Sequence, residues 1–247
     1  MNKAYFTISD RNNLPHYEKL KNSLAKFNTA GIPLILIDEE KVAKFNDPHF
    51  YYRATPLIAK ELKKQGYEYI VKIDADSLIL GDLDHVWKAL YDVDVAVVQN
   101  SNPREAKNYP VTVWDIDVQR YVNCGFVGMH SEEFIDHWLE KCYTPAFYRY
   151  QFREQDILNI LVYWGNYKVE WLDSGDKFHG LVAKQYEPQM ILKDGKVILP
   201  QSEEWPKDGD KQIVCYHFAG GNDPNKGNYR NKFQPEVVKY IDELVKP

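Results

Sequence analysis

The chain has 247 residues, a formal net charge of −5 and a sequence pI of about 5.8. One α/β domain fits this length, since single hydrophobic cores grow to roughly 250 residues before chains divide. The acidic balance argues against nucleic acid as the main partner, because binding a polyanion needs a basic face. We therefore expect one domain over residues 1–247 that does not bind nucleic acid.

Cysteine usage and hydropathy bear on where the protein works. The three cysteines are odd in number and show no Cys-x-x-Cys spacing, which argues against a disulfide framework or a structural zinc site. No apolar run approaches the ~20 residues that span a bilayer, and no basic N-terminus leads into an apolar segment. These features predict a cytoplasmic protein without a transmembrane segment.

The first half of the chain alternates short apolar runs with amphipathic segments. Strands are predicted at residues 4–8, 32–38, 67–73 and 93–98. Helices are predicted at 16–27, 55–66 and 83–90. The second helix carries Thr55 as its cap, Pro56 at its first helical position and Gly66 as its stop. The alternation predicts a mostly parallel sheet with helices on both faces, and such sheets bind ligands beyond the carboxyl ends of their strands.

The second half is less regular. Its apolar runs predict strands at 111–118, 121–130, 167–172 and 212–218. Its amphipathic segments predict helices at 131–142 and 153–165. Residues 203–211 and the segment after His217 are polar and rich in Gly, Pro and Asn, which is typical of loops.

An Asp-x-Asp pair occurs five times, so spacing alone does not select a site. The pairs are Asp74/Asp76, Asp82/Asp84, Asp92/Asp94, Asp115/Asp117 and Asp208/Asp210. Only Asp74 and Asp76 end a predicted central strand, where side chains two residues apart face the same side, about 6.5 Å from each other. Charges next to apolar strands cost several kcal/mol unless they are compensated. A hard divalent cation shared by the two carboxylates is the expected compensation.

Three metal-dependent interpretations compete for this pair. An EF-hand loop needs an oxygen ligand at its fifth position and Gly at its sixth, where this chain has Leu78 and Ile79. A phosphatase with an aspartyl nucleophile normally carries its Asp-x-Asp after the first strand, and here two strands come first. The remaining interpretation is a metal held against the diphosphate of a sugar nucleotide.

Four segments, in order, resemble glycosyltransferases of the GT-A fold, most closely family 8, the group of glycogenin and the bacterial lipooligosaccharide galactosyltransferases. "YIVKIDADSLIL" is similar to the Asp-x-Asp strand of that family and "YVNCGFVGMH" to its "FNAGVLLIN" segment. "REQDILN" resembles "DQDILN", and "YHFAGG" resembles "HYCG". The resemblance implies an α/β, Rossmann-like nucleotide-diphospho-sugar transferase domain with a mostly parallel mixed central sheet.

The resemblance also implies the ligands of the metal and the donor. It makes Asp74, Asp76 and His217 the metal ligands, a set that suits Mn²⁺, with Mg²⁺ as the alternative. It places the donor, a nucleoside-diphosphate sugar and most simply a UDP-hexose, beside Ala75, Asn123 and Gly125. For Gly125, a bulge or a close backbone approach is an equally open interpretation.

The remaining implied roles lie on three other segments. Gln155 would sit beside the anomeric carbon, and Asp156 would bind sugar hydroxyls. The nucleotide base would contact the N-terminal segment through Thr7, Ser9 and Asp10. Departures from the family pattern leave Lys226 or Arg53 as the candidate phosphate contact, and Gln99 stands where some relatives hold the sugar with an acidic residue.

The expected reaction is transfer of a sugar to a hydroxyl of a glycan, glycolipid or protein, with retention of the anomeric configuration. If the enzyme inverts instead, a general base is needed, and Asp156 or Asp173 is the first to test. A sugar nucleotidyltransferase would normally show an N-terminal Gly-rich loop, which "YFTISDRNNLP" lacks. A protein that only binds sugar nucleotides would not need two carboxylates and a histidine together.

Overall fold

The structure is a computed structural model of the chain and describes residues 1–99, 116, 121–150, 152–180, 185–218 and 228–247. The strand expected at 111–118 therefore lies outside the described residues, apart from Ile116, and so does Lys226.

A six-stranded sheet forms the centre of the fold, in the order β2-β1-β3-β6-β5-β7. Its strands are β1 (Lys3–Ile8), β2 (Leu34–Ile37), β3 (Tyr69–Ile73), β5 (Val95–Gln99), β6 (Val122–Met129) and β7 (Val169–Trp171). The pairs β1/β2, β1/β3 and β5/β7 are parallel, whereas β6 runs antiparallel to both of its neighbours. The prediction of a mostly parallel mixed sheet is therefore confirmed.

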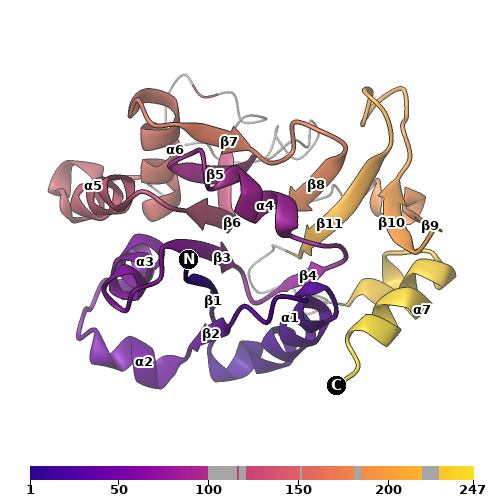
Figure 1. The fold of residues 1–247 in the computed structure, drawn as a ribbon, viewed down its shortest axis with the longest axis horizontal. Coiled ribbons are helices and arrows are strands. Elements are labelled where there is room, and N and C mark those ends of the chain that lie inside the picture. The colour runs from indigo at the N-terminus through magenta and orange to yellow at the C-terminus, as the bar shows by residue number, and fades with distance from the viewer. Residues whose placement is uncertain (100–115, 117–120, 151, 181–184, 219–227) are drawn as a thin grey trace.

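Helices cover both faces of this sheet, as the alternation of apolar runs with amphipathic segments predicts. The helices are α1 (Leu14–Phe27), α2 (Glu39–Lys44), α3 (Ala54–Lys64), α4 (Asp84–Ala89), α5 (Glu132–Tyr143) and α6 (Glu154–Trp164). Phe6 belongs to the core cluster beneath α3, α5 and α6, and its neighbour Tyr5 to the cluster beneath α1 and α4. In Figure 1, α3, α5 and α6 lie to the left of the sheet and α1 and α4 to the right.

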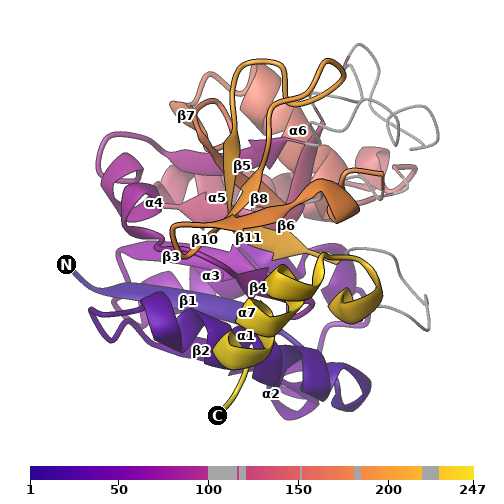
Figure 2. The same cartoon turned by 90° about the vertical axis from the view of Figure 1, so that its right-hand side faces the viewer.

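A second sheet is built from the last third of the chain and one short strand that follows β3. Its strands are β4 (Ser77–Ile79), β8 (Lys177–Gly180), β9 (Ile191–Lys193), β10 (Lys196–Leu199) and β11 (Lys211–His217). The order is β4-β11-β10-β9, and β8 pairs in parallel with β11. Figure 2 shows α7 (Pro235–Leu244) beside this sheet, and Val237 and Ile241 of α7 are fully buried in its core cluster. Short 3₁₀ turns lie at Arg11–Asn13, Phe50–Tyr52, Pro145–Phe147, Glu187–Gln189 and Tyr229–Asn231.

Two local predictions are wrong. The segment after His217 is not all loop, because α7 occupies residues 235–244, and it forms because its apolar side chains close the second core. Thr55 is not the cap of α3, and Pro56 is its third residue rather than its first, since the helix begins at Ala54. The Thr55 side chain and backbone N–H both donate to Glu154. The stop is where the sequence predicts it, because Gly66 has a left-handed φ of 91° directly after the helix.

Two further features follow from the described residues. Within them, no helix is both long enough and apolar enough to cross a membrane. The cysteines Cys124, Cys142 and Cys215 are buried free thiols.

A histidine pair lies between α4 and β8, with His179 fully buried and His85 partly buried. Nε2 of His85 contacts Nε2 of His179 at 2.7 Å, and Nδ1 of His179 lies 3.1 Å from Oδ1 of Asp173. Burial lowers the pKa of His85 to about 4 and that of His179 to about 3. Burial also raises the pKa of Asp173 well above its ordinary value. The folded protein therefore holds both rings neutral.

The histidine pair predicts acid destabilisation of a definite sign. Because the folded pKa of His85 lies below the unfolded value near 6.5, the unfolded chain binds more protons between about pH 6.5 and pH 4, and stability falls as pH falls through that window. The variant His85→Gln lacks the imidazole that takes up this proton in the unfolded chain. Urea unfolding from pH 7 to pH 4.5 should therefore show a steeper loss of stability in the wild type than in the variant. The slopes should differ by somewhat less than the roughly 1.4 kcal/mol per pH unit of one fully coupled proton, because solvent screens the partly exposed ring.

Asp173 has the opposite sign, since its raised pKa makes the folded state take up a proton first on acidification. Asp173 titrates in both the wild type and His85→Gln, so the difference between their slopes of stability against pH isolates the contribution of His85. Parallel curves would show that the His85 ring does not titrate as its position requires.

Candidate metal centre

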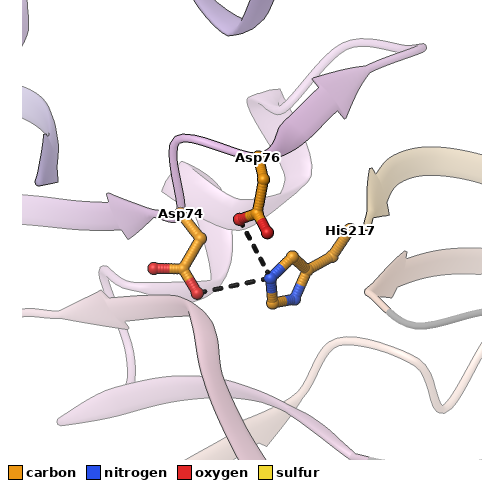
Figure 3. A group of neighbouring side chains, drawn as sticks. All are labelled: Asp74, Asp76 and His217. Atoms are coloured by element: carbon orange, nitrogen blue, oxygen red, sulfur yellow. Dashed lines mark ion pairs between the residues drawn. The ribbon is translucent and has the colours of Figure 1, made fainter. Parts of the chain in front are cut away.

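Asp74, Asp76 and His217 come together at the edge where β3 ends. Nε2 of His217 lies 3.3 Å from Oδ2 of Asp74 and 3.3 Å from Oδ1 of Asp76. One ligand atom from each residue fits within 4.8 Å of the others. Figure 3 shows both carboxylates, from the turn after β3, pointing toward the same nitrogen of the His217 imidazole. The three residues predicted from the sequence are therefore neighbours, although 141 positions separate Asp76 from His217.

The backbone brings these side chains together by joining the two sheets at one turn. The Asp74 N–H donates to the Gly125 carbonyl of β6 at 2.8 Å, which ties the end of β3 to its neighbour. The chain then turns through a 3.1 Å bond from Ser77 N–H to the Asp74 carbonyl and enters β4. Antiparallel pairing places Ser77 opposite His217, and Phe218 N–H donates to the Asp76 carbonyl at 3.0 Å. The second sheet thus presents His217 to the turn.

Gly125 makes room for the His217 ring. A Cβ atom at position 125 would lie 2.4 Å from both Cε1 and Nδ1 of His217 and 2.7 Å from Oδ1 of Asn123, all far inside contact distance. Pairing between β5 and β6 is also irregular here, with the register shifting beyond Val97. The interpretation of Gly125 as a close backbone approach in an irregular strand is confirmed.

Lys72 is a part of the site that sequence analysis missed. It lies inside β3, is 4% exposed, and its ammonium pairs with Oδ1 of Asp74 and donates to the Cys124 carbonyl. Burial alone would lower the pKa of Lys72, but the adjacent Asp74 carboxylate outweighs it and the pKa is raised. The sequence signal that could have identified Lys72 is a lysine within the otherwise apolar run "YIVKI". Lys72 holds one oxygen of Asp74 and leaves the other facing His217.

This set of donors fits a divalent cation. Two carboxylates and one imidazole converge from a rigid edge, and ions of the Mn²⁺ and Mg²⁺ class prefer oxygen ligands, with imidazole tolerated better by Mn²⁺. A metal placed here would be held by Asp74, Asp76 and His217.

Three aspartates of the other Asp-x-Asp pairs have structural partners. Asp94 accepts from Lys168 N–H at 2.8 Å, Asp208 pairs with Lys211 at 3.0 Å, and Asp210 accepts from Gln201 N–H at 2.9 Å. Among the described residues, the pair at the end of β3 is the one that a histidine joins in a cluster able to hold a metal ion.

The start of α6 packs against β6 beside the metal centre. The Gln155 side chain accepts from Cys124 N–H at 2.8 Å, and Oδ1 of Asn123 accepts from Gly125 N–H at 2.6 Å. The Gln155 side chain of α6 therefore binds the residue of β6 that directly precedes Gly125, the glycine beneath the His217 ring. The structure brings the predicted donor residues Asn123, Gly125 and Gln155 together.

Asp156 is fully buried, and both of its oxygens accept hydrogen bonds. The Tyr121 hydroxyl donates to one at 2.6 Å and Phe152 N–H to the other at 2.8 Å. Asn159, one turn further on, exchanges hydrogen bonds with both the N–H and the carbonyl of Val122. These buried bonds fix α6 against β6 and so fix the position of Gln155.

Glu154 connects α6 to α3. Its carboxylate accepts from Thr55 N–H and from the Thr55 hydroxyl, both at 2.8 Å, and so caps the first turn of α3. Burial raises the pKa of Glu154. The sequence analysis did not identify this capping contact between Glu154 and Thr55.

The residue before it, Arg153, has a strained backbone. Its φ of 48° and ψ of −111° lie outside the left-handed helical region and in a region that glycine favours. A conformation of this kind costs about 1–3 kcal/mol. The Arg153 guanidinium lies 4.2 Å from the centre of the Tyr52 ring. Such a contact contributes ~0.5–1 kcal/mol at an exposed site, which offsets only part of that cost.

The N-terminal residues proposed for the base lie after β1. Thr7 is fully buried, and its hydroxyl has no partner among the described residues. The Ser9 hydroxyl donates to the Asp10 carbonyl at 3.2 Å, and the Asp10 carboxylate accepts from Asn13 N–H at 2.9 Å. Ala75, between the two metal-centre aspartates, is 7% exposed.

Arg53 forms a buried ion pair with Asp47 and does not present an unpaired guanidinium. Its Nε donates to Asp47 at 2.6 Å, its side chain is 8% exposed, and its guanidinium lies 3.9 Å from the centre of the Tyr143 ring. The hydrogen bond from Arg53 lowers the pKa of Asp47. A phosphate contact by Arg53 stays a prediction. Gln99, where some relatives carry an acidic residue, donates to the Tyr163 hydroxyl at 3.2 Å.

Solved structures with the same fold are glycosyltransferases. The galactosyltransferase LgtC, crystallised with donor and acceptor sugar analogues, superimposes with a TM-score of 0.57 at 14% identity, over 99% of this chain and 97% of that one. A glycosyltransferase involved in the glycosylation of the major capsid of PBCV-1 gives 0.56 at 13% identity, over 94% and 99%. The bifunctional WbbM gives 0.56 at 12% identity, over 98% of this chain but 51% of WbbM. The chain thus has the GT-A fold of the glycosyltransferases.

Sequence comparison goes less far. General stress protein A of Bacillus subtilis strain 168 is 22% identical over 206 residues, which is 77% of this chain and 64% of that protein. The chain therefore spans less than two thirds of that relative and about half of WbbM. No family model matches the sequence.

The Gly125 contact predicts the effect of one added methyl group. Gly125→Ala should push the His217 ring out of place and weaken Mn²⁺ binding about 10- to 100-fold, the range typical when groups that orient a metal ligand are changed. Isothermal titration with Mn²⁺ measures the affinity, and circular dichroism checks the fold. Gly175→Ala is the matched control, because a Cβ there meets nothing within 4 Å. Equal Mn²⁺ affinity in the two folded variants would show that His217 does not bind the metal.

Proposed function

We propose that the protein is a metal-dependent glycosyltransferase that moves a hexose from a UDP-sugar to a hydroxyl of a glycan, glycolipid or protein. The observation that carries this proposal is the Asp74, Asp76 and His217 cluster at the carboxyl end of β3, the edge at which sheets of this type bind ligands. The GT-A fold supports it, since that fold occurs in transferases that use nucleotide sugars.

Each part of the site has a task in this reaction. A bound Mn²⁺ or Mg²⁺ would neutralise the charge that develops on the leaving diphosphate. Asp74, Asp76 and His217 hold that charge at a fixed place, and Lys72 orients Asp74. Asn123 and Gln155, fixed along β6, orient the donor sugar in front of the acceptor hydroxyl. Thr7, whose buried hydroxyl has no described partner, is a candidate contact to the nucleotide.

Retention fits the groups around Gln155. An amide is a poor nucleophile, so attack from the front face of the sugar, with the departing phosphate accepting the proton, needs no protein base. The inverting alternative needs a base, and Asp156 would have to give up one of its two buried hydrogen bonds to serve. Asp173 accepts a hydrogen bond from His179 N–H at 2.7 Å, which it would likewise have to give up.

The carboxylates supply the direct test. Asp76→Asn keeps the shape of the side chain but removes its charge, so Mn²⁺-dependent UDP release from the best donor in a panel of UDP- and GDP-sugars should fall about 100-fold or more. Asp94→Asn, in a pair with a structural partner, is the control. Undiminished turnover by a folded Asp76→Asn protein would remove the metal assignment. Absence of release from every donor by the wild type would reject the transferase itself.

The configuration of the product is a separate expectation. If Gln155 sits at the anomeric carbon and no carboxylate acts as base, the new glycosidic bond should keep the anomeric configuration of the donor. Proton NMR of the early product, taken before secondary hydrolysis, reads the anomeric coupling. An inverted anomer would transfer the catalytic role to a carboxylate.

A further inference from the structure

A pocket of about 240 Å³ opens beside the start of α6. This is somewhat smaller than the ~300–1,000 Å³ of pockets for drug-sized ligands, so it suits one sugar ring with its substituent. Side chains from the starts of α3 and α6 and from the turn after α5 line it, among them His49, Tyr52, Arg53, Tyr148, Arg153 and Ile157. None of the described lining residues carries a carboxylate.

The charge of this pocket resides on Arg153. The other guanidinium, that of Arg53, is already balanced by Asp47 in a two-point ion pair. Among the described residues, no carboxylate pairs with Arg153, whose head lies over the Tyr52 ring. Glycine at position 153 would relax the strained backbone, and stacking of Arg153 on Tyr52 offsets only part of that strain. A ligand anion would account for a cation held in this position.

Exposed aromatic rings gather around the same pocket. Tyr52 and Tyr148 line it and are 45% and 44% exposed. Tyr51, next to Tyr52, is 63% exposed, and Tyr143, stacked on Arg53, is 44% exposed. Flat rings with a polar tip provide stacking surface for a sugar face and hydroxyls for its edge. Rings and cation together match a charged saccharide better than a bare phosphate ion.

The pocket lies next to the reaction centre but is separate from the metal cluster. Arg153 comes two residues before Gln155, whose side chain is bound to β6 beside Gly125. Asp74, Asp76 and His217 do not line the pocket. A donor diphosphate held at the metal cluster would therefore leave Arg153 without a partner, and the molecule expected on this side of Gln155 is the acceptor.

We propose that this pocket binds an acceptor sugar that carries a phosphate or carboxylate group, with Arg153, held over the Tyr52 ring, as the cation and Tyr148 as the stacking surface. This inference rests on the proposed glycosyl transfer and adds the class of acceptor. Charge-assisted hydrogen bonds to a guanidinium are about twice as strong as neutral ones, so Arg153 selects an anionic sugar over its neutral analogue.

Equilibrium binding tests this without any turnover. Glucose 6-phosphate, glucuronate and glucose are titrated into the protein by NMR, with and without UDP and Mg²⁺. The wild type should bind one or both anionic sugars at least about 10-fold more tightly than glucose, and the better one identifies phosphate or carboxylate as the preferred group. Arg153→Gln should remove this preference and leave glucose binding unchanged. Arg153→Lys, which keeps the charge, should retain part of it.

Two further variants make the result decisive. Arg153→Gly should also lose the preference while unfolding at the same or a higher temperature, because it relieves the backbone strain; a purely structural role predicts no change in sugar binding. Lys196→Gln, an exposed cation of the second sheet, is the charge control. Equal affinity of the wild type for charged and neutral sugars, or no binding of either anion, overturns the proposal.

Titration with UDP separates this inference from the proposed function. UDP affinity should be the same in Arg153→Gln and the wild type, and a loss of affinity would assign Arg153 to the donor and overturn the acceptor pocket. Failure of the wild type to bind UDP at all would contradict the proposed transfer, whichever sugars bind.

Discussion

The contact between the His217 ring and the backbone of Gly125 is the constraint on which the candidate site depends. The imidazole occupies the space that a Cβ atom at position 125 would fill. Two sheets meet at this point, one contributing the end of β3 and the irregular part of β6, the other the end of β11. The aspartate turn passes directly from the first sheet to the second, so a shift of either sheet would separate the carboxylates from the imidazole.

The same need for precise position explains the polar groups buried at the start of α6. A buried polar group without a hydrogen-bond partner costs about 1–3 kcal/mol. Glu154, Asp156 and Asn159 avoid this cost because each has partners on α3, β6 or the segments beside them. Hydrogen bonds are directional, whereas apolar contacts alone would let the helix slide along the sheet. These bonds therefore define where Gln155 stands relative to the metal cluster.

Charge is distributed unevenly along this edge of the fold. Carboxylates dominate at the turn after β3, where Lys72 balances part of one of them. On the other side of Gln155, Arg153 is a cation that no described carboxylate balances. A reaction that brings together a metal-bound diphosphate and a second, anionic sugar would use both regions, and the separation keeps the two anions apart.

Sequence by itself determined the central sheet, the helices on its two faces and the three metal-centre residues. It did so because these features depend on local patterns. The patterns are apolar runs that alternate with amphipathic segments, helical periodicity, Gly66 at the end of a helix, and a pair of aspartates at the end of a buried strand. The order of matched segments then linked His217 to that pair across most of the chain.

Tertiary structure alone decided the rest. The strands β4, β8, β9 and β10 are too short to be recognised locally, and they form because they pair and pack with residues distant in sequence. The helix α7 does carry a local signal, Pro235 at its start and the apolar residues Val237 and Ile241 one turn apart, which the sequence analysis missed. The sequence suggests that Thr55 is a helix cap, but in the fold it is Glu154 that caps this turn through Thr55. The sequence suggests that Lys72 interrupts a strand, but in the fold it pairs with Asp74. The pocket at Arg153 arises where three helices meet. Each of these features is a contact between segments, and no local pattern encodes which partner a side chain will meet.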